Sequence, residues 1–186
     1  MCADTPETLD YKSTLNLPKT DFPMRAGLPK REPEWLERWE KIGVYDRLRE
    51  KQGRKPFTLH DGPPYANGNL HIGHALNKTI KDMIVRSHQM MGFDARYIPG
   101  WDCHGLPIEH KVMTDLVNSG KIEKLNALDD DTRRIAIRKA CKKDAEKFVK
   151  LQTGQLQRWL TLADYVNPYL TMDPAYEAAV LEVFAK

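Results

Sequence analysis

Apolar residues recur at every third or fourth position between His71 and about Met91, a spacing that predicts an amphipathic helix. Gly92 follows the last apolar position and is typical of a residue that ends a helix. The expected apolar face consists of Ile72, Leu76, Ile80, Met83, Ile84 and Met90. The residues expected largely outside that face are Lys78, Lys81, Asp82 and Arg86. The pattern therefore separates an apolar side of this helix from a charged one.

Two short apolar runs flank the helix and are bounded by proline and glycine. Residues 56–60 predict a buried strand that ends before Gly62-Pro63-Pro64. Residues 95–98 predict a second strand that ends at Pro99-Gly100. Strand, helix and strand in this order suggest a parallel βαβ unit with a right-handed crossover. The predicted fold class is therefore α/β.

The first 33 residues are rich in proline and polar residues and predict an extended arm. Pro33 is expected to open a helix, because proline is favoured in the first helical turn. The apolar positions of this helix would be Trp35, Leu36, Trp39 and Ile42, and Val44, Tyr45 and Leu48 would continue it up to Gly53. Residues 1–50 thus form a first predicted unit, an arm followed by a helix.

Three further helices are predicted in the C-terminal half. One runs from Pro107 to about Asn118, and another covers residues 175–186. The longest begins at the N-cap candidates of residues 129–132 and continues to about Leu160. Its apolar positions are Ile137, Cys141, Ala145, Phe148, Leu151 and Trp159. Its basic residues are Arg133, Arg134, Arg138, Lys139, Lys142, Lys143, Lys147 and Lys150. A solvated face is the favoured interpretation of these charges, and a polyanion-binding face is the alternative.

Composition bounds the class of protein. The chain has 186 residues, of which 41% are hydrophobic and 30% charged, as expected for a globular domain. No apolar run approaches a membrane span, and the N-terminus lacks the pattern of a secretory signal. Cys2, Cys103 and Cys141 are too widely spaced for a disulfide framework, so a cytoplasmic location is expected. The net charge of +3 is too small to imply nucleic acid by itself.

The residues before the predicted helix carry candidate chemistry. The stretch from His60 to His74 predicts a strand end, a loop rich in proline, glycine and asparagine, and two histidines at a helix start. A helix N-terminus offers unpaired N–H groups and the positive end of its dipole, which suits anions. His71 and His74 lie on one side of the first turn, and Gly73 lets a ligand approach the backbone. A nucleotide such as ATP fits this place.

His71-Ile72-Gly73-His74 is identical to the first signature of class I aminoacyl-tRNA synthetases. The sequence segments on either side of it, from Asp61 to Gly68 and from Pro99 to Glu109, closely resemble those of the isoleucyl type of that class. Valyl and leucyl types share the architecture but differ in the sequence of these segments. The resemblance begins at about Asp10 and includes residues 167–172, so it covers nearly the whole chain.

This resemblance implies the first half of a Rossmann-like, HUP-type catalytic domain in residues 51–186. Members of the family are several times longer than this chain. The second signature, Lys-Met-Ser-Lys-Ser, is absent from the sequence, as are the editing and anticodon-binding parts. The chain is therefore expected to be an N-terminal fragment or a truncated product, whose partner would be the remainder of the synthetase.

The resemblance also implies two reactions in the complete enzyme. Isoleucine is activated by ATP with Mg²⁺ to isoleucyl-adenylate, and the isoleucyl group is then transferred to tRNA(Ile). The family's ATP-binding signature corresponds to residues 71–74, with His71 and His74 as catalytic residues and Ile72 and Gly73 between them. The amino-acid contacts correspond to Gly62, Pro63 and Asp102. No zinc is expected in this portion.

Several other interpretations of these residues are open. His71 and His74, with Cys103 and His104, could bind a metal, although paired ligand clusters are missing. The two histidines could instead be ordinary caps, and Asp102 could only cap its loop. Cys103 and Trp101 are expected to be packing residues. The substrate could be valine, leucine or methionine, and a chain that exists alone could be a non-catalytic half-domain that binds ATP or a partner.

Overall fold

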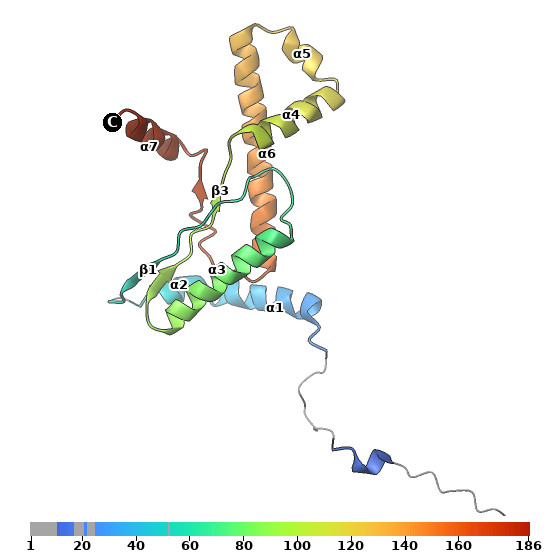
Figure 1. The fold of residues 1–186 in the computed structure, drawn as a ribbon, viewed down its shortest axis with the longest axis vertical. Coiled ribbons are helices and arrows are strands. Elements are labelled where there is room, and N and C mark those ends of the chain that lie inside the picture. The colour runs from blue at the N-terminus through green and yellow to red at the C-terminus, as the bar shows by residue number, and fades with distance from the viewer. Residues whose placement is uncertain (1–10, 17–20, 22–24, 52) are drawn as a thin grey trace, which may run out of the picture.

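The computed structural model describes residues 11–16, 21, 25–51 and 53–186. Strand β1 (Pro56–Thr58) pairs in parallel with β2 (Asp94–Arg96), and Phe57 lies opposite Ala95. Helix α3 (Ile72–Met90) connects them and packs on β2. The parallel βαβ unit expected from the sequence is thus confirmed (Figure 1).

A second parallel pair continues the chain beyond this unit. Strand β3 (Gly100–Trp101) pairs with β4 (Tyr169–Leu170), and Tyr65 forms an isolated parallel bridge with Asp102. The segment after β2 therefore runs beside both the loop before α3 and the segment after α6. This arrangement gathers distant parts of the sequence around residues 100–102.

The first strand differs from its prediction. Residues 56–60 were expected to form a buried strand, but β1 is three residues long, and only Phe57 within it is even half-buried. Pro56, the first residue of β1, has no backbone N–H to donate to the strand pair. The second strand begins one residue before its expected start.

The N-terminal helix begins earlier than the sequence pattern indicates. Helix α1 spans Leu28–Lys41, so Pro33 lies inside it instead of opening it, and the Pro at the helix start is Pro29. Pro33 cannot donate to the carbonyl of Pro29. The Arg158 guanidinium donates to that carbonyl at 3.2 Å, which satisfies the acceptor. The expected arm thus ends before residue 28, and parts of it lie outside the described residues; Tyr11–Thr14 forms a short 3-10 helix.

The remaining helices lie near their predicted positions. They are α2 (Val44–Arg49), α4 (Leu106–Asn118), α6 (Asp130–Arg158) and α7 (Pro174–Phe184). The Asp129 carboxylate caps α6 by accepting from the Thr132 N–H at 3.0 Å. A short helix, α5 (Ile122–Asn126), was not predicted. Figure 1 shows α6 as a long rod with α4 and α5 packed on it towards one end and α1 towards the other.

Two clusters form the core. The larger joins β3, α4 and α6 through Trp101, Ile108 and Phe148. The smaller joins α3 and β2 through Val85, Ala95 and Tyr97. The basic residues of α6 are exposed except for Arg133 and Arg158, which are half-buried, and this fits the expected solvated face. In the part of the chain that is described, no helix is long and apolar enough to cross a membrane.

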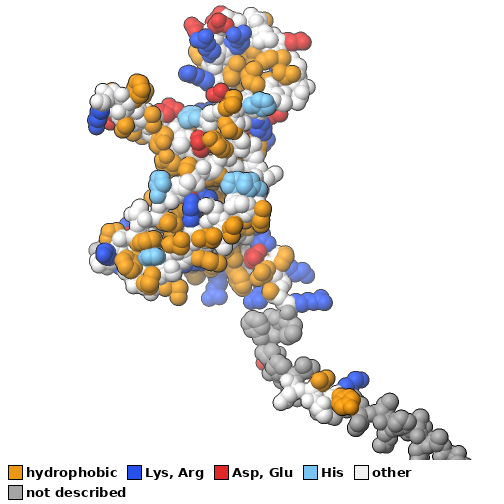
Figure 2. All heavy atoms as spheres, viewed as in Figure 1, with side chains coloured by type: hydrophobic (Ala, Val, Ile, Leu, Met, Phe, Trp, Pro, Cys, Tyr) orange, Lys and Arg blue, Asp and Glu red, His pale blue; other side chains and the backbone are white. Residues whose placement is uncertain are grey.

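Helix α3 exposes most of the side that was expected to be buried and buries a lysine that was expected to be exposed. Five residues of the predicted apolar face are between 48% and 89% exposed, namely Ile72, Leu76, Ile80, Met83 and Met90, and Ile84 is half-buried. Lys78, predicted to lie outside this face, is only 1% exposed. The helix packs through Val85 and Lys78 because Asp61 provides a partner for the lysine. Apolar side chains consequently gather over α3 on the face seen in Figure 2.

Candidate active site at the start of helix α3

The two signature histidines form a reciprocal cap at the N-terminus of α3. The Gly73 N–H donates to His71 Nδ1 at 3.1 Å, and the His71 N–H donates to His74 Nδ1 at 3.2 Å. The ring centroids lie 3.8 Å apart. Because each Nδ1 accepts a hydrogen bond, each neutral ring carries its proton on Nε2. The site therefore presents two Nε2–H donors beside the positive end of a helix.

Gly73 is required by the geometry of this cap, in addition to the close approach of a ligand that the sequence led us to expect. A Cβ at position 73 would lie 2.9 Å from Cε1 and 3.1 Å from Nδ1 of His71, too close for the ring to keep its place. The structure thus adds a second reason for a glycine between the histidines. The interpretation of these histidines as caps is confirmed. Among the described residues neither Nε2 forms a hydrogen bond, so both can donate to a ligand at the same time.

The pKa of His74 is lowered from its usual 6.5, first by burial and then by the nearby His71 and Lys78 charges. The neutral ring is therefore favoured in the folded protein. Its contribution to stability is fully present above pH 6.5 and is lost as the pH falls through the lower folded pKa. We expect the His74 ring, followed by NMR in ¹³C-histidine-labelled protein without ligand, to titrate below pH 6.5. A midpoint at or above 6.5 would contradict the cap, because protonated Nδ1 cannot accept from His71.

Asp61 anchors the loop before α3 to the helix. Its carboxylate accepts from Lys78 Nζ at 2.5 Å and from Lys81 Nζ at 2.6 Å. It also accepts from the Gly100 N–H at 3.3 Å and from the Tyr97 hydroxyl at 3.4 Å. Burial lowers the pKa of Lys78, although Asp61 opposes this shift. Two lysines facing one carboxylate leave a surplus of positive charge within about three turns of the helix start.

The structure brings the predicted amino-acid contacts side by side. The Asp102 N–H donates to the Pro64 carbonyl and the Ala66 N–H donates to the Asp102 carbonyl, both at 2.9 Å. Pro63 lies against Gly100, where an added Cβ would be 3.3 Å from the Pro63 Cβ. The loop with exposed Gly62 and half-buried Pro63 is thus fixed to the segment that carries Asp102.

The Asp102 carboxylate is half-buried and partly engaged. Its Oδ1 accepts from the His104 N–H at 3.2 Å and from the Thr171 hydroxyl at 3.5 Å. The expected alternative, that Asp102 caps its own loop, is therefore confirmed as a local role. Among the described residues Oδ2 accepts no hydrogen bond, so one oxygen remains for a ligand.

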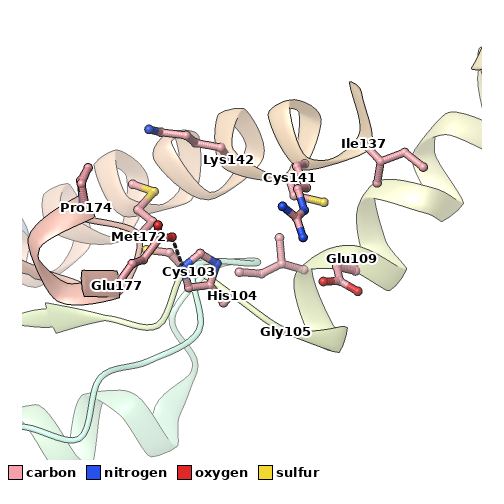
Figure 3. Close-up of a pocket in the computed structure, with 12 residues that line it drawn as sticks. Cys103, His104, Gly105, Glu109, Ile137, Cys141, Lys142, Met172, Pro174 and Glu177 are labelled. Carbon is pink, nitrogen blue, oxygen red and sulfur yellow. Dashed lines mark ion pairs between the residues drawn. The ribbon is translucent and has the colours of Figure 1, made fainter. Parts of the chain in front are cut away.

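A cavity of about 550 Å³ opens on the other residues of the β3–α4 segment (Figure 3). It is lined by Cys103, His104, Gly105, Ile108 and Glu109, by Ile137, Arg138, Cys141 and Lys142 of α6, and by Met172, Pro174 and Glu177. His104 Nε2 lies 3.1 Å from Glu177 Oε1. The cavity contains none of the predicted site residues, although Asp102 directly precedes it in the sequence.

Burial raises the pKa of Cys103 to about 11, so its thiol stays protonated at neutral pH and is a poor nucleophile. Cys103 and Trp101 are both buried, as expected for packing residues. Within the described ranges, no group of three or more histidine, cysteine or acidic side chains is placed to hold a metal ion.

Sequence reasoning missed the residues that hold the site together. Asp61 lies in the loop that resembles the family, but the sequence pattern predicts no function for it. The pattern predicts Lys78 outside the apolar face of α3. Gln152 and Gln155 of α6 received no role either, because a glutamine inside a long charged helix gives no sequence signal of burial. Their contacts with the loop before α3 join residues more than 80 positions apart in the sequence.

Comparison with known proteins agrees with this geometry. A family model described as tRNA synthetases class I (I, L, M and V) matches residues 34–186. An isoleucine–tRNA ligase of Ruegeria pomeroyi is 64% identical over 187 residues, which cover 100% of this chain and 19% of that relative. An isoleucine–tRNA ligase of Rhodopseudomonas palustris is 52% identical over 178 residues, which cover 95% of this chain and 18% of that relative.

A solved structure supports the fold. The ternary complex of Agrobacterium radiobacter K84 agnB2 LeuRS with tRNA and LeuAMS matches with a TM-score of 0.61 and 21% identity, over 87% of this chain and 18% of that chain. The chain spans about a fifth of the length of the curated relatives it matches. The Rossmann-like partial domain expected from the resemblance is thereby confirmed. Since the family model covers most of its residues, the chain belongs to the class I tRNA synthetases.

Proposed function

We propose that this chain is the N-terminal part of an isoleucine–tRNA ligase located in the cytoplasm. Residues 1–50 would form its arm and first helices, and residues 51–186 the first half of its nucleotide-binding catalytic domain. The complete enzyme would activate isoleucine with ATP and transfer it to tRNA(Ile). The observation that supports this most is the histidine cap of α3, whose two Nε2–H donors lie at a helix start in a chain 64% identical to an isoleucine–tRNA ligase.

The proposed site suits adenylyl transfer. An oxygen of the isoleucine carboxylate attacks the α-phosphorus of ATP, and the bond from that phosphorus to the bridging oxygen breaks. Pyrophosphate leaves with the electron pair, and isoleucyl-adenylate remains. Negative charge grows on the phosphate oxygens during this step, so donors fixed in advance lower the barrier. His71 and His74 supply such donors, and the Lys78 and Lys81 charges add a favourable field.

The second carboxylate oxygen of Asp102 would hold the ammonium group of isoleucine in a charge-assisted hydrogen bond. Gly62 and Pro63, held against the same segment, would contact the substrate through a carbonyl and a pocket wall. Mg²⁺ would accompany ATP and neutralise charge on its phosphates. The histidines fit phosphate oxygens better than a cation, because both Nδ1 acceptors are already used within the cap.

Isoleucine-dependent exchange of labelled pyrophosphate into ATP by the complete protein tests the proposal. We expect exchange with isoleucine to exceed exchange with valine, leucine or methionine at equal concentration. Isoleucine and valine differ by one methylene, which a hydrophobic pocket distinguishes by only about 10–200-fold. Valine should therefore give the next highest rate. Exchange that is stronger with valine than with isoleucine would overturn the assignment.

A second candidate function rests on the exposed face of α3. A chain that existed alone would leave Ile72, Leu76, Ile80 and Met83 in solvent, and such a surface favours association. It would then be a non-catalytic half-domain that binds ATP or a partner. A denaturing gel of the native source, probed with an antibody against residues 1–50, separates the two: a band near 21.5 kDa favours the half-domain, and a much larger band favours the ligase.

A further inference from the structure

Two glutamines of α6 contact the loop that leads into the histidine cap. Gln152 is 1% exposed, and all of its amide hydrogen-bonding groups are used within the protein. Its Oε1 accepts from the Trp101 indole N–H at 2.9 Å. Its Nε2 donates to the Tyr65 carbonyl at 3.0 Å and to the Gly68 carbonyl at 2.8 Å. One side chain therefore joins strand β3 to the loop.

Gln155, on the next turn of α6, holds the far end of the same loop. Its Oε1 accepts from the Leu70 N–H at 2.9 Å, directly before His71. Its Nε2 donates to the Asn69 side-chain oxygen at 2.8 Å. The two glutamines thus reach both ends of the segment Tyr65–Leu70 from a single helix.

This loop is the covalent link between the two halves of the proposed site. At its start, Ala66 is hydrogen-bonded to Asp102, the proposed ammonium contact. At its end lies His71, the N-cap of α3. Gly68 and the asparagines on either side of it offer little conformational restraint of their own. Helix α6 supplies that restraint, because Ala145, Phe148 and Leu156 fix it in the larger core cluster.

We propose that Gln152 and Gln155 are positioning residues that set the location of His71 and His74 relative to Asp102. This role rests on the proposed function, because it matters for the reaction only if isoleucine and ATP meet between these groups. Neither glutamine needs to touch a substrate. Each acts by fixing the backbone that presents the groups which do.

The kinetic test uses Gln152→Met and Gln155→Met in the complete enzyme. Methionine keeps the length and volume of glutamine and removes its hydrogen bonds. Displacement of reacting groups by about 1 Å costs on the order of 100-fold, so we expect kcat for adenylate formation to fall about 10–100-fold. The KM values for isoleucine and ATP should change much less. Unchanged kcat in both variants, or a rise confined to KM, would refute the positioning role.

The conservative variant Gln155→Glu separates positioning from general damage. A carboxylate still accepts from the Leu70 N–H, so this variant should recover most of the kcat that Gln155→Met loses. Lys150→Met on the same helix is the matched control, because its side chain is exposed, and its kcat should equal that of the wild type. Equal losses in the Glu and Met variants would contradict the contact with Leu70.

Hydrogen exchange tests the contact between Gln155 and the loop Tyr65–Leu70, which we call the clamp, independently of the reaction. In Gln155→Met, the amide of Leu70 should exchange faster, whereas Gln155→Glu should retain its protection. Unchanged exchange in Gln155→Met would overturn the inference even if the enzyme activates isoleucine. A different result would refute the proposed function but keep the clamp. In that case the wild-type enzyme would show no isoleucine-dependent exchange of pyrophosphate into ATP, while Gln155→Met would still lose hydrogen-exchange protection at Leu70. Gln155 is only half-buried, so its variants provide the test if Gln152→Met fails to fold.

Discussion

Asp61→Asn in the complete protein is expected to destabilise the α3 region by about 3–5 kcal/mol, because it removes the carboxylate that pairs with both buried Lys78 and half-buried Lys81. The side chains of Asp61 and Lys78 are 4% and 2% exposed, so water cannot replace the lost partner. The asparagine would also accept less strongly from the Gly100 N–H, which loosens the segment leading to Asp102. The lysine charges would then repel each other in a poorly solvated place.

Native-state hydrogen exchange of the α3 amides is the measurement, since it reports on this region separately from the unfolding of the rest of the protein. Two comparisons sharpen it. Lys78→Met should cost less than Asp61→Asn, because it leaves Asp61 paired with Lys81 and fills the space with an apolar side chain. Asp115→Asn breaks an exposed pair with Lys111 and should leave exchange in α3 unchanged. Equal protection in Asp61→Asn and wild-type protein would show that the ion cluster does not anchor the helix.

The sequence allowed the order of elements to be predicted well where local signals dominate. The end of α3 before Gly92 and the start of α6 at Asp129 both depend on neighbouring residues, and the structure confirms both boundaries. Pro33 misled the prediction because a proline is tolerated inside α1 when Arg158, 125 positions later, satisfies the carbonyl that it leaves unpaired. No local pattern carries that information.

The same difference between local and long-range information explains why the apolar face of α3 is exposed. Its 3.6-residue apolar period is real, yet the face it defines is exposed in the described structure, while Lys78 is buried. Periodicity identifies the apolar face but not the surface that covers it. Relatives of this chain are about five times longer, so the described residues contain only part of the surroundings in which the relatives' sequences fold. The buried lysine required knowledge of Asp61 as its partner, a contact across 17 positions.

The residues of the candidate site also divide into those that local sequence predicts and those that depend on distant contacts. The short signature and its glycine specify the histidine cap locally, so its residues could be named from the sequence. The role of Asp102 was implied by resemblance, and the structure adds that one of its oxygens is occupied by its own loop. The supporting glutamines could not be predicted, because helical propensity does not distinguish a buried glutamine from an exposed one.

His74→Ala in the complete enzyme is expected to lower kcat for adenylate formation about 10²–10³-fold, with a smaller change in KM for ATP. The reason is that the His74 Nε2–H would donate to an oxygen on which charge grows only during the reaction. An interaction that strengthens in the transition state affects kcat more than ground-state binding. The measurement is the single-turnover rate of isoleucyl-adenylate formation at saturating ATP, together with the affinity for ATP.

Alanine also removes the acceptor of the His71 N–H, so a second variant must separate the cap from the donor. In His74→Asn, the side-chain oxygen occupies the place of Nδ1 and preserves the cap, but nothing replaces Nε2. If the donor carries the effect, asparagine and alanine should lose activity to a similar extent, while asparagine alone keeps the protection of the first α3 amides. His110→Ala, on the exposed side of α4, controls for loss of an imidazole. An active asparagine variant beside an inactive alanine variant would mean that His74 acts through the shape of the helix start, and the phosphate contact would have to be assigned to His71 alone.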